Sequence, residues 1–258
     1  MATLILARHG RTTANASGIL AGRSKGVGLD EAGVAQARAA GQRIEGLPLA
    51  AIVTSPLQRC RETVREMARR LPQQPEVSSE RRLLECDYGT WTGRDLKSLA
   101  KEPLWKTVQA HPSAVTFPDG ESMAQMMARS VAAVRDWDAR VEEERGPDAV
   151  WLAVTHADVI KAVLADALGM HLDLFQRIAV DPASLSVVRY TPLRPFVLSM
   201  NSVAGDLSAL RPPGRRGSRR RRHGSDAAVG GGAGSVRPAS ARDVTGGAVG
   251  RGGAGATP

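Results

Sequence analysis

The chain has 258 residues, of which 42% are apolar, and that fraction is enough to build a folded core. Its formal net charge is +9, but residues 211–258 contain ten Arg and two acids, so +8 lies there and residues 1–210 are nearly neutral at +1. Two cysteines are too few for a disulfide framework, and the first apolar run is shorter than a signal peptide. No segment approaches the ~18 apolar residues that span a bilayer. We therefore expect a cytoplasmic protein that does not enter membranes.

Strands are expected to alternate with helices along the first 200 residues. Short apolar runs predict strands at 3–7, 50–54, 150–155, 184–191 and 196–200. Apolar spacing, caps and stop signals predict helices from Asp30 to residue 44, from Ser55-Pro56 to about 71, and over 94–101, 103–110, 122–145 and 159–168. This alternation predicts an α/β fold, a three-layer α/β/α sandwich with a mostly parallel central sheet.

The C-terminal part has a different composition. From residue 211 onward there are no aromatic residues, 13 of the 27 glycines, and an Arg-rich run at 215–222. Such a segment buries too little apolar surface to offset the entropy of ordering it. We therefore predict a folded domain over 1–205 and a disordered, basic tail over 206–258. The tail is either a solvated extension or a segment that binds nucleic acid or anionic lipid electrostatically. The lack of aromatic residues that could stack on bases favours the solvated extension.

Three of the expected strands end in polar residues that packing does not explain. Arg8 and His9 follow the first strand, Arg59 lies shortly after the second, and His156 follows the third. Ligands of open α/β sheets bind beyond the carboxyl ends of the strands. Guanidinium groups match phosphate oxygens bidentately, and an imidazole is a nucleophile near neutral pH. If the strands are neighbours, these four residues predict a site for a phosphoryl group.

Four segments, in chain order, resemble the motifs of the histidine phosphatase superfamily, the phosphoglycerate mutase-like proteins. They are Leu-Ala-Arg-His-Gly-Arg-Thr at 6–12 with Asn15, Ser-Pro-Leu-Gln-Arg-Cys-Arg-Glu-Thr at 55–63, Leu-Glu-Cys-Asp-Tyr-Gly-Thr-Trp-Thr-Gly at 84–93, and Thr-His-Ala at 155–157.

The resemblance implies a role for each matching residue. His9 is expected to be the nucleophile that becomes phosphohistidine, and Arg8, Arg59 and His156 to hold the phosphate. Glu85 is expected to protonate the leaving oxygen and later to activate water, with Asp87 as a rival acid. The phosphate or its loop is expected to receive further hydrogen bonds from residues of the same motifs: Thr12, Asn15 and Ala157.

The implied activity is hydrolysis of a small phosphorylated metabolite by a metal-independent phosphatase of the histidine acid phosphatase type, with no cofactor. No His-x-x-x-His pair or zinc-like cysteine spacing is present, and His156-Ala-Asp158 is a weak metal signal. A phosphomutase that uses the same residues is the alternative. A non-catalytic protein that binds phospho-ligands or nucleic acid fits less well. Oligomeric state and substrate stay open.

The sequence also departs from the family pattern. Ala157 stands where many members have Gly, and the loop 22–28 is basic where relatives often carry an acid. Arg23 or Lys25 could therefore meet a second anionic group of the substrate. The longer insertion of glycolytic mutases is absent, which favours a phosphatase, and the region 94–125 is expected to set specificity. Cys60, beside Arg59, is expected to be a packing residue rather than a reactive thiol.

Overall fold

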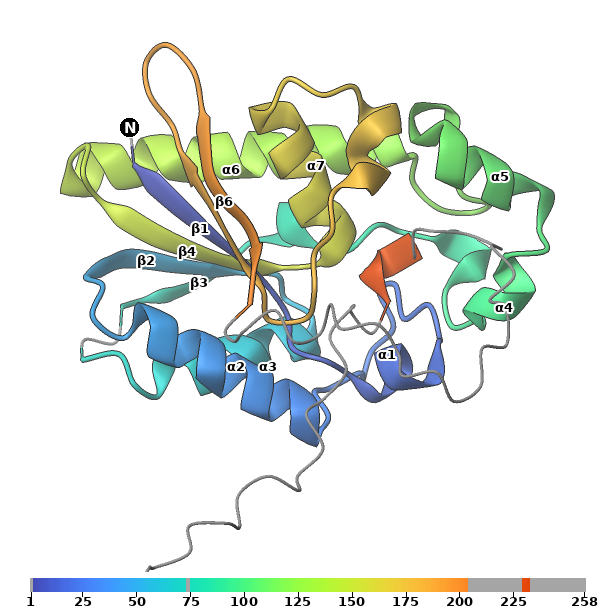
Figure 1. Cartoon of the computed structure of the whole chain (residues 1–258), viewed down its shortest axis with the longest axis horizontal. Coiled ribbons are helices and arrows are strands. Elements are labelled where there is room, and N and C mark those ends of the chain that lie inside the picture. Colours follow the sequence, from blue (N-terminus) through green and yellow to red (C-terminus); the bar gives the residue numbers. More distant parts are fainter. Residues whose placement is uncertain (1, 73–74, 204–228, 233–258) are drawn as a thin grey trace, which may run out of the picture.

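The computed structural model describes residues 2–72, 75–203 and 229–232. A six-stranded sheet lies between two layers of helices, which is the predicted α/β/α sandwich (Figure 1). The strands are β1 (Thr3–Arg8), β2 (Leu49–Thr54), β3 (Val77–Ser79), β4 (Val150–Thr155), β5 (Leu185–Arg189) and β6 (Phe196–Ser202). The α-helices are α1 (Thr13–Ser17), α2 (Glu31–Ile44), α3 (Gln58–Ala68), α4 (Leu96–Leu99), α5 (Pro103–Ala110), α6 (Met123–Arg145) and α7 (Ala157–Ala167).

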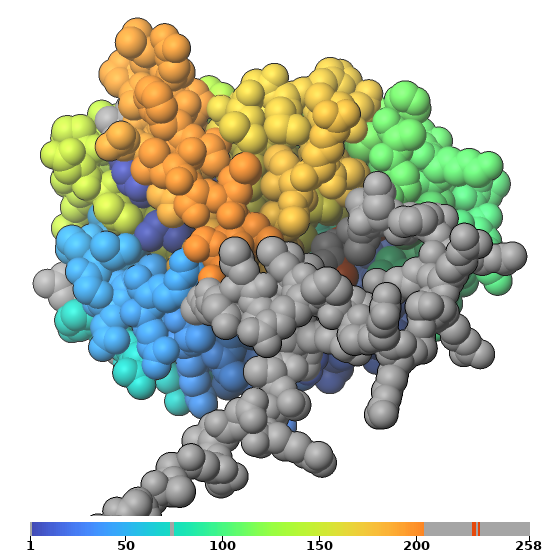
Figure 2. All heavy atoms as spheres, in the orientation of Figure 1, coloured from blue at the N-terminus to red at the C-terminus, as the bar shows by residue number. Residues whose placement is uncertain are grey.

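The strand order is β3-β2-β4-β1-β5-β6. The pairs β3–β2, β2–β4 and β4–β1 are parallel, whereas β5 runs antiparallel to both β1 and β6. The sheet is therefore mostly parallel, as predicted. The β5–β6 hairpin extends the antiparallel side and protrudes at one end of the molecule (orange in Figure 2).

The central strands are buried on both faces because each contributes to two apolar clusters. Along β1, Leu4 and Leu6 belong to the cluster that also contains apolar residues of α6 and α7. The alternate residues Ile5 and Ala7 belong to the cluster with residues of α2 and α3. Successive side chains of a strand point to opposite faces, so a continuous apolar run is what a doubly covered strand requires.

The register of the sheet brings three strand ends together. Arg8 of β1 pairs with Thr155 of β4, and Thr54 of β2 pairs with Val154. The next residues, His9 and Ser55, leave the sheet at the same edge as the residue that follows β4. The topology alone thus gathers the polar residues on which the phosphoryl site was predicted.

Of the six predicted helix starts, those of α2, α5 and α6 agree with the structure and those of α3, α4 and α7 differ. The Asp30 side chain caps α2 by accepting from Gly33 N, and Ser122 caps α6 in a capping box with Gln125. The predicted helix is present as α3, but its predicted start was wrong, because it begins at Gln58 and not at Ser55-Pro56. The hydroxyl of Ser55 contacts His156 instead of a helix N-terminus.

The helix α7 begins at Ala157, two residues earlier than predicted. The short elements α1 and β3 were not predicted. Of the predicted tail, only residues 229–232 are described, and they form a turn against the site; the Arg-rich run 215–222 lies outside the described residues. Within the described ranges, no helix is long and apolar enough to cross a membrane.

Candidate active site

The loop after β1 is held by a close backbone contact. An ideal Cβ on Gly10 would lie 2.4 Å from the carbonyl oxygen of Gly33 in the first turn of α2. Gly10 N also donates to Thr63 Oγ1 of α3 at 3.0 Å, and that hydroxyl donates to Arg59 O at 2.7 Å. Only glycines permit this approach, so the loop that carries His9 is fixed against α2 and α3.

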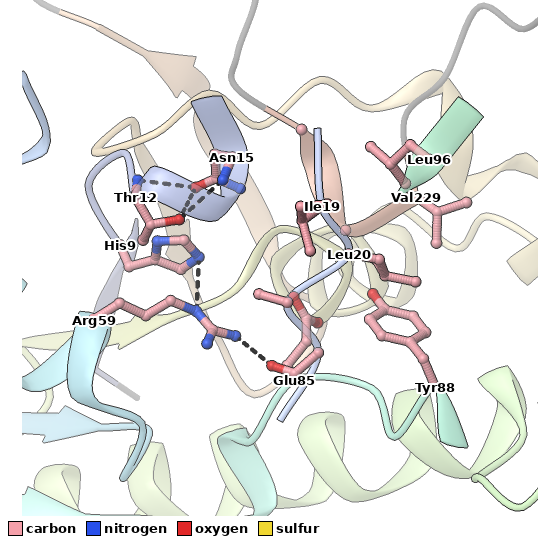
Figure 3. A pocket seen from close by; sticks show the side chains of 14 residues that line it. His9, Thr12, Asn15, Ile19, Leu20, Arg59, Glu85, Tyr88, Leu96 and Val229 are labelled. Atoms are coloured by element: carbon pink, nitrogen blue, oxygen red, sulfur yellow. Dashed lines mark hydrogen bonds between the residues drawn. The ribbon is translucent and has the colours of Figure 1, made fainter. Parts of the chain in front are cut away.

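Arg59 connects the two histidines of the site. Its Nε donates to His9 Nε2 at 3.2 Å, and its Nη2 donates to His156 Nδ1 at 3.1 Å and to Gly22 O at 2.7 Å. The two imidazole rings lie 5.4 Å apart, centroid to centroid. Figure 3 shows His9 and Arg59 facing the same pocket. Arg59 Nη1 is buried and has no hydrogen-bond partner within the described residues, so one donor is available to a ligand.

His9 is held as a neutral ring whose Nε2 lone pair accepts a hydrogen bond from Arg59. Its Nδ1 lies 2.7 Å from Gly10 O, and a carbonyl only accepts, so Nδ1 carries the hydrogen and Nε2 the lone pair. Burial lowers the pKa of His9 well below its usual value, and the positive charges of Arg59 and Arg8 lower it further. An unprotonated Nε2 is therefore present at neutral pH, and it points toward Arg59.

His156 is fixed by a partner on each ring nitrogen. Its Nε2 donates to Ser55 Oγ at 2.8 Å while Nδ1 accepts from Arg59, and burial followed by the charge of Arg59 lowers its pKa well below the usual value. Cys60 Sγ lies 3.6 Å from His156 Nε2, but burial raises the pKa of this thiol to about 12. Cys60 is thus a buried thiol rather than a thiolate, as expected of a packing residue.

Glu85 lines the same pocket as an almost fully buried carboxyl group. Its Oε1 accepts from Cys86 N at 3.0 Å, and its Oε2 lies 3.9 Å from His156 Nδ1. Burial, followed by the negative charge of Asp158, raises the pKa of Glu85 to about 7. The carboxyl group can therefore hold or release a proton near neutral pH. The rival acid Asp87 pairs with Arg23, is partly exposed, and is not among the residues that line the pocket.

Arg8 reaches the site from the end of β1. Its guanidinium is buried; Nη1 donates to Val180 O at 2.8 Å, and Nη2 donates to Gly232 O at 2.5 Å. The structure thus brings His9, Arg8, Arg59, Glu85 and His156 to one edge of the sheet.

The neutral residues named with them have more varied positions. Thr12 and Asn15 both line the pocket, and their polar groups bond to each other in the capping box of α1. Ala157 is buried as the first residue of α7 and is not among the residues that line the pocket.

Arg23 supports the segment that carries the acid and does not offer its charge to the pocket. It donates to Glu85 O at 2.9 Å and forms ion pairs with Asp87 and Glu121. The expectation that Arg23 meets a second anionic group of the substrate is therefore not supported by its contacts. On the other side of Glu121, Arg129 of α6 donates to Leu84 O and Glu85 O.

Sequence reasoning missed three other residues of the site: Ser55, Tyr88 and Asp158. Tyr88 Oη donates to Asp158 Oδ2 at 2.8 Å, so these two residues form one buried pair. Their positions could have indicated a place in the site, because Tyr88 is three residues from Glu85 and Asp158 is two residues from His156. Nothing in the sequence indicated that they meet.

Comparison with known proteins gives a consistent result. The chain is 30% identical over 207 residues to phosphoserine phosphatase 1 of Hydrogenobacter thermophilus, covering 78% of this chain and 92% of that protein. It is also 30% identical over 217 residues to a probable phosphoglycerate mutase GpmB of Enterobacter sp. strain 638, covering 83% and 97%.

The solved structures agree with these relatives. The chain superimposes with a TM-score of 0.69 and 25% identity on mycobacterial glucosyl-3-phosphoglycerate phosphatase Rv2419c in complex with VO3, covering 78% of this chain and 98% of that one. Residues 4–203 match the pattern of the histidine phosphatase superfamily, branch 1. With this match and the relatives above, the chain belongs to the histidine phosphatase superfamily.

Proposed function

We propose that the protein hydrolyses a phosphomonoester through a phosphohistidine on His9. The observation that carries the proposal is the pairing of a neutral, buried imidazole with a protonatable carboxyl group in one pocket: His9 Nε2 bears a lone pair, and the pKa of Glu85 is raised to about 7. A nucleophile that is unprotonated at neutral pH and an acid whose pKa lies near neutral pH are what a two-step phosphoryl transfer requires.

In the first step, His9 Nε2 attacks phosphorus and the ester P–O bond breaks. Arg59 and Arg8 donate to the phosphoryl oxygens, with the buried Nη1 of Arg59 as one available donor. Their positive charge offsets the negative charge that develops on these oxygens. The leaving oxygen takes the proton of Glu85 and departs as an alcohol, and Glu85 becomes a carboxylate.

In the second step, water attacks the phosphorus of the phosphohistidine and the P–N bond breaks. The carboxylate of Glu85 accepts a proton from that water, which restores the acid and releases phosphate. His156 keeps Arg59 oriented by accepting a hydrogen bond at Nδ1.

A phosphomutase is the second candidate, because several relatives at 30% identity are named probable phosphoglycerate mutases. A mutase must also grip the remaining anionic groups of its substrate. Arg59 is the one Lys or Arg among the residues that line the described pocket, and Arg8 contacts the turn at 229–232 that closes it; much of the remaining lining is apolar, from Ile19, Leu20, Ala21, Tyr88 and Leu96. This lining favours hydrolysis of a small phosphorylated metabolite with one phosphate. The two cysteines are buried and free, which is in keeping with a reducing, cytoplasmic compartment.

The test is turnover of para-nitrophenyl phosphate in EDTA by the wild type, His9→Ala and the control His111→Ala, whose imidazole is largely exposed. We expect His9→Ala to lose about three orders of magnitude or more in kcat, and His111→Ala to match the wild type. Turnover that survives His9→Ala would contradict the assignment of the nucleophile. Isomerisation that depends on a bisphosphorylated primer, without release of phosphate, would favour the mutase.

A further inference from the structure

Three residues of the segment 229–232 line the pocket: Val229, Gly230 and Gly232. This segment lies more than 20 positions beyond the last described residue of the sheet domain. It includes a short 3-10 turn, Val229–Gly231 (red in Figure 1), and Figure 3 shows Val229 near Leu20, Leu96 and Tyr88. The side chain of Val229 is only 2% exposed and belongs to the main apolar cluster. This turn is therefore packed into the site.

Two buried charged groups hold the backbone of the turn. On one side, Gly230 N donates to Asp158 Oδ2 at 3.1 Å, the oxygen that also accepts from Tyr88. On the other side, Arg8 Nη2 donates to Gly232 O at 2.5 Å and lies 3.5 Å from Gly230 O. Hydrogen bonds to charged groups are the stronger class, so these contacts hold the turn more firmly than apolar packing alone.

The turn also requires a particular sequence. Gly230 has φ of 69° and ψ of 12°, in the left-handed region, and a Cβ there would lie 3.1 Å from Leu20 Cδ1. A residue other than glycine would be strained by its backbone and crowded by Leu20. An apolar residue followed by glycines fits, and Val229-Gly230 has this pattern.

The turn and a phosphorylated substrate need the same space. With the turn in place, the remaining cavity has a volume of about 20 Å³. One water needs roughly 10–15 Å³ by this measure, so a phosphate ester does not fit beside the turn. The carbonyl oxygens of the turn accept from Arg8, whose guanidinium is expected to bind phosphoryl oxygens.

We propose that Arg8 and Asp158, with the apolar wall of Leu20 and Tyr88, form a peptide-binding subsite whose ligand is the chain's own residues 229–232, and that this segment competes with substrate. The competition rests on the proposed function, in which Arg8 binds the phosphoryl oxygens of the substrate. The ligand is an uncharged backbone with one N–H donor, on Gly230, followed by two carbonyl acceptors, on Gly230 and Gly232. Substrate binds only in molecules from which the turn has left, so the apparent affinity falls by the fraction of open molecules.

The test uses the full chain with Val229→Asp, which places a charge among buried apolar groups. The control is Val236→Asp, the same change in the same tail but outside the described residues. Titration calorimetry with inorganic phosphate should give a Kd lower by about threefold or more in Val229→Asp, with wild-type affinity in the control. The KM for para-nitrophenyl phosphate should fall by the same factor while kcat stays constant. Gly230→Val, which removes the turn by a different route, should behave like Val229→Asp.

A synthetic peptide with the sequence of residues 227–233 should raise the KM of Val229→Asp again, competitively. Equal phosphate affinity in the wild type, Val229→Asp and Val236→Asp would overturn the inference, and so would weaker binding in Val229→Asp. The proposed function fails separately, through turnover that is absent or independent of His9. Tighter phosphate binding by Val229→Asp would then still place residues 229–232 in competition for the pocket.

Discussion

Glu85 shows how the position of one carboxyl group determines its chemistry. It lies in the same short segment as Asp87, two residues away, yet Asp87 is partly exposed and paired with Arg23, whereas Glu85 is buried near Asp158. Burial and a like charge both disfavour ionisation. Glu85 is therefore suited to hold a proton at neutral pH.

The pH dependence of turnover follows from this raised pKa. A general acid works only while it is protonated, and the pKa of Glu85 is raised to about 7. We expect kcat/KM for para-nitrophenyl phosphate to fall as the pH rises above about 7. The residual kcat/KM of Glu85→Gln should not show this fall, because glutamine has no proton to lose in this pH range. A wild-type limb that persists in Glu85→Gln would assign the titration to another residue.

The same carboxyl group makes stability depend on pH. The folded pKa lies above the ordinary value of 4.5, so between these values the unfolded chain binds fewer protons than the folded one. The free energy of unfolding of the wild type therefore falls as the pH rises from about 4.5 to 7. Glu85→Gln escapes this loss and should exceed the wild type by about 3 kcal/mol at most at pH 8, with little difference at pH 4, in urea unfolding monitored by tryptophan fluorescence.

Ser55 is expected to act as a positioning residue through His156. In Ser55→Ala, the buried Nε2–H of His156 loses its acceptor at 2.8 Å, and the ring is free to turn away from Arg59. We expect kcat to fall about tenfold and Ser55→Thr, which keeps the hydroxyl, to recover most of it. Equal loss in both variants would mean that packing, and not the hydrogen bond, matters at this position.

At the scale of elements, the loop after β1 is built around two glycines. A Cβ on Gly33 would lie 2.0 Å from Arg11 O, and one on Gly10 would lie 2.4 Å from Gly33 O. The first turn of α2 and the loop that carries His9 are thus in direct backbone contact. Any side chain at either glycine must push them apart.

Gly33→Ala should therefore reduce both stability and turnover, although alanine has a higher helix propensity than glycine. We expect a loss of about 2 kcal/mol or more in the free energy of unfolding, measured by urea titration. Gly46→Ala, just after the same helix, is the matched control, because a Cβ there meets nothing within 4 Å. Its effect should be near zero. Equal stability of the two variants would mean that the loop adapts without cost.

The elements also show what the sequence could predict. The strands β1, β2 and β4 are buried on both faces, so they appear as continuous apolar runs, and β1 and β4 end at site histidines. By contrast, β3 has three residues, Val-Ser-Ser, and is hydrogen-bonded only to β2 at the sheet edge. Its strand conformation depends on pairing with β2, for which the local sequence carries no periodic signal.

Site residues were predicted where a sequence motif placed them, and they were missed where only tertiary contacts bring them to the site. His9 and Arg59 follow buried strands, whereas Ser55 was misread as a helix cap, since its partner His156 is 101 positions away in the chain. Likewise, the composition of the tail predicted disorder, and its contact of Val229 with the pocket depends on a cavity shape that composition does not encode.

At the scale of the whole molecule, the site unites groups from both faces of the sheet. Arg59 is carried by α3 on one face, whereas the segment of Glu85 is attached to α6, on the other, through Arg129. Arg129 donates to Arg82 O, Leu84 O and Glu85 O and pairs with Glu121. Arg129 therefore fixes the position of Glu85 relative to Arg59, which is carried by the helix on the opposite face of the sheet.

Arg129→Ala should lower kcat by about tenfold or more and destabilise the fold by roughly 2–3 kcal/mol, because three partly buried carbonyl groups lose a charged donor. Arg135→Ala, on the same helix, removes only an exposed pair with Asp166 and should cost less than about 1 kcal/mol, with normal turnover. The two variants can be compared by urea titration and by hydrolysis of para-nitrophenyl phosphate. Equal effects would contradict the role of Arg129.

The strand order has a consequence for biosynthesis. Strand β1 is synthesised first, but its two neighbours in the sheet are synthesised much later: the parallel β4 at residues 150–155 and the antiparallel β5 at residues 185–189. During translation, the backbone hydrogen-bonding groups on both edges of the apolar strand β1 therefore stay unpaired until most of the domain has left the ribosome. Unpaired apolar strands invite association, and pairing at such sequence separation is slow. The nascent chain should accordingly depend on chaperones until β4, the fourth parallel strand, emerges and completes the centre of the sheet.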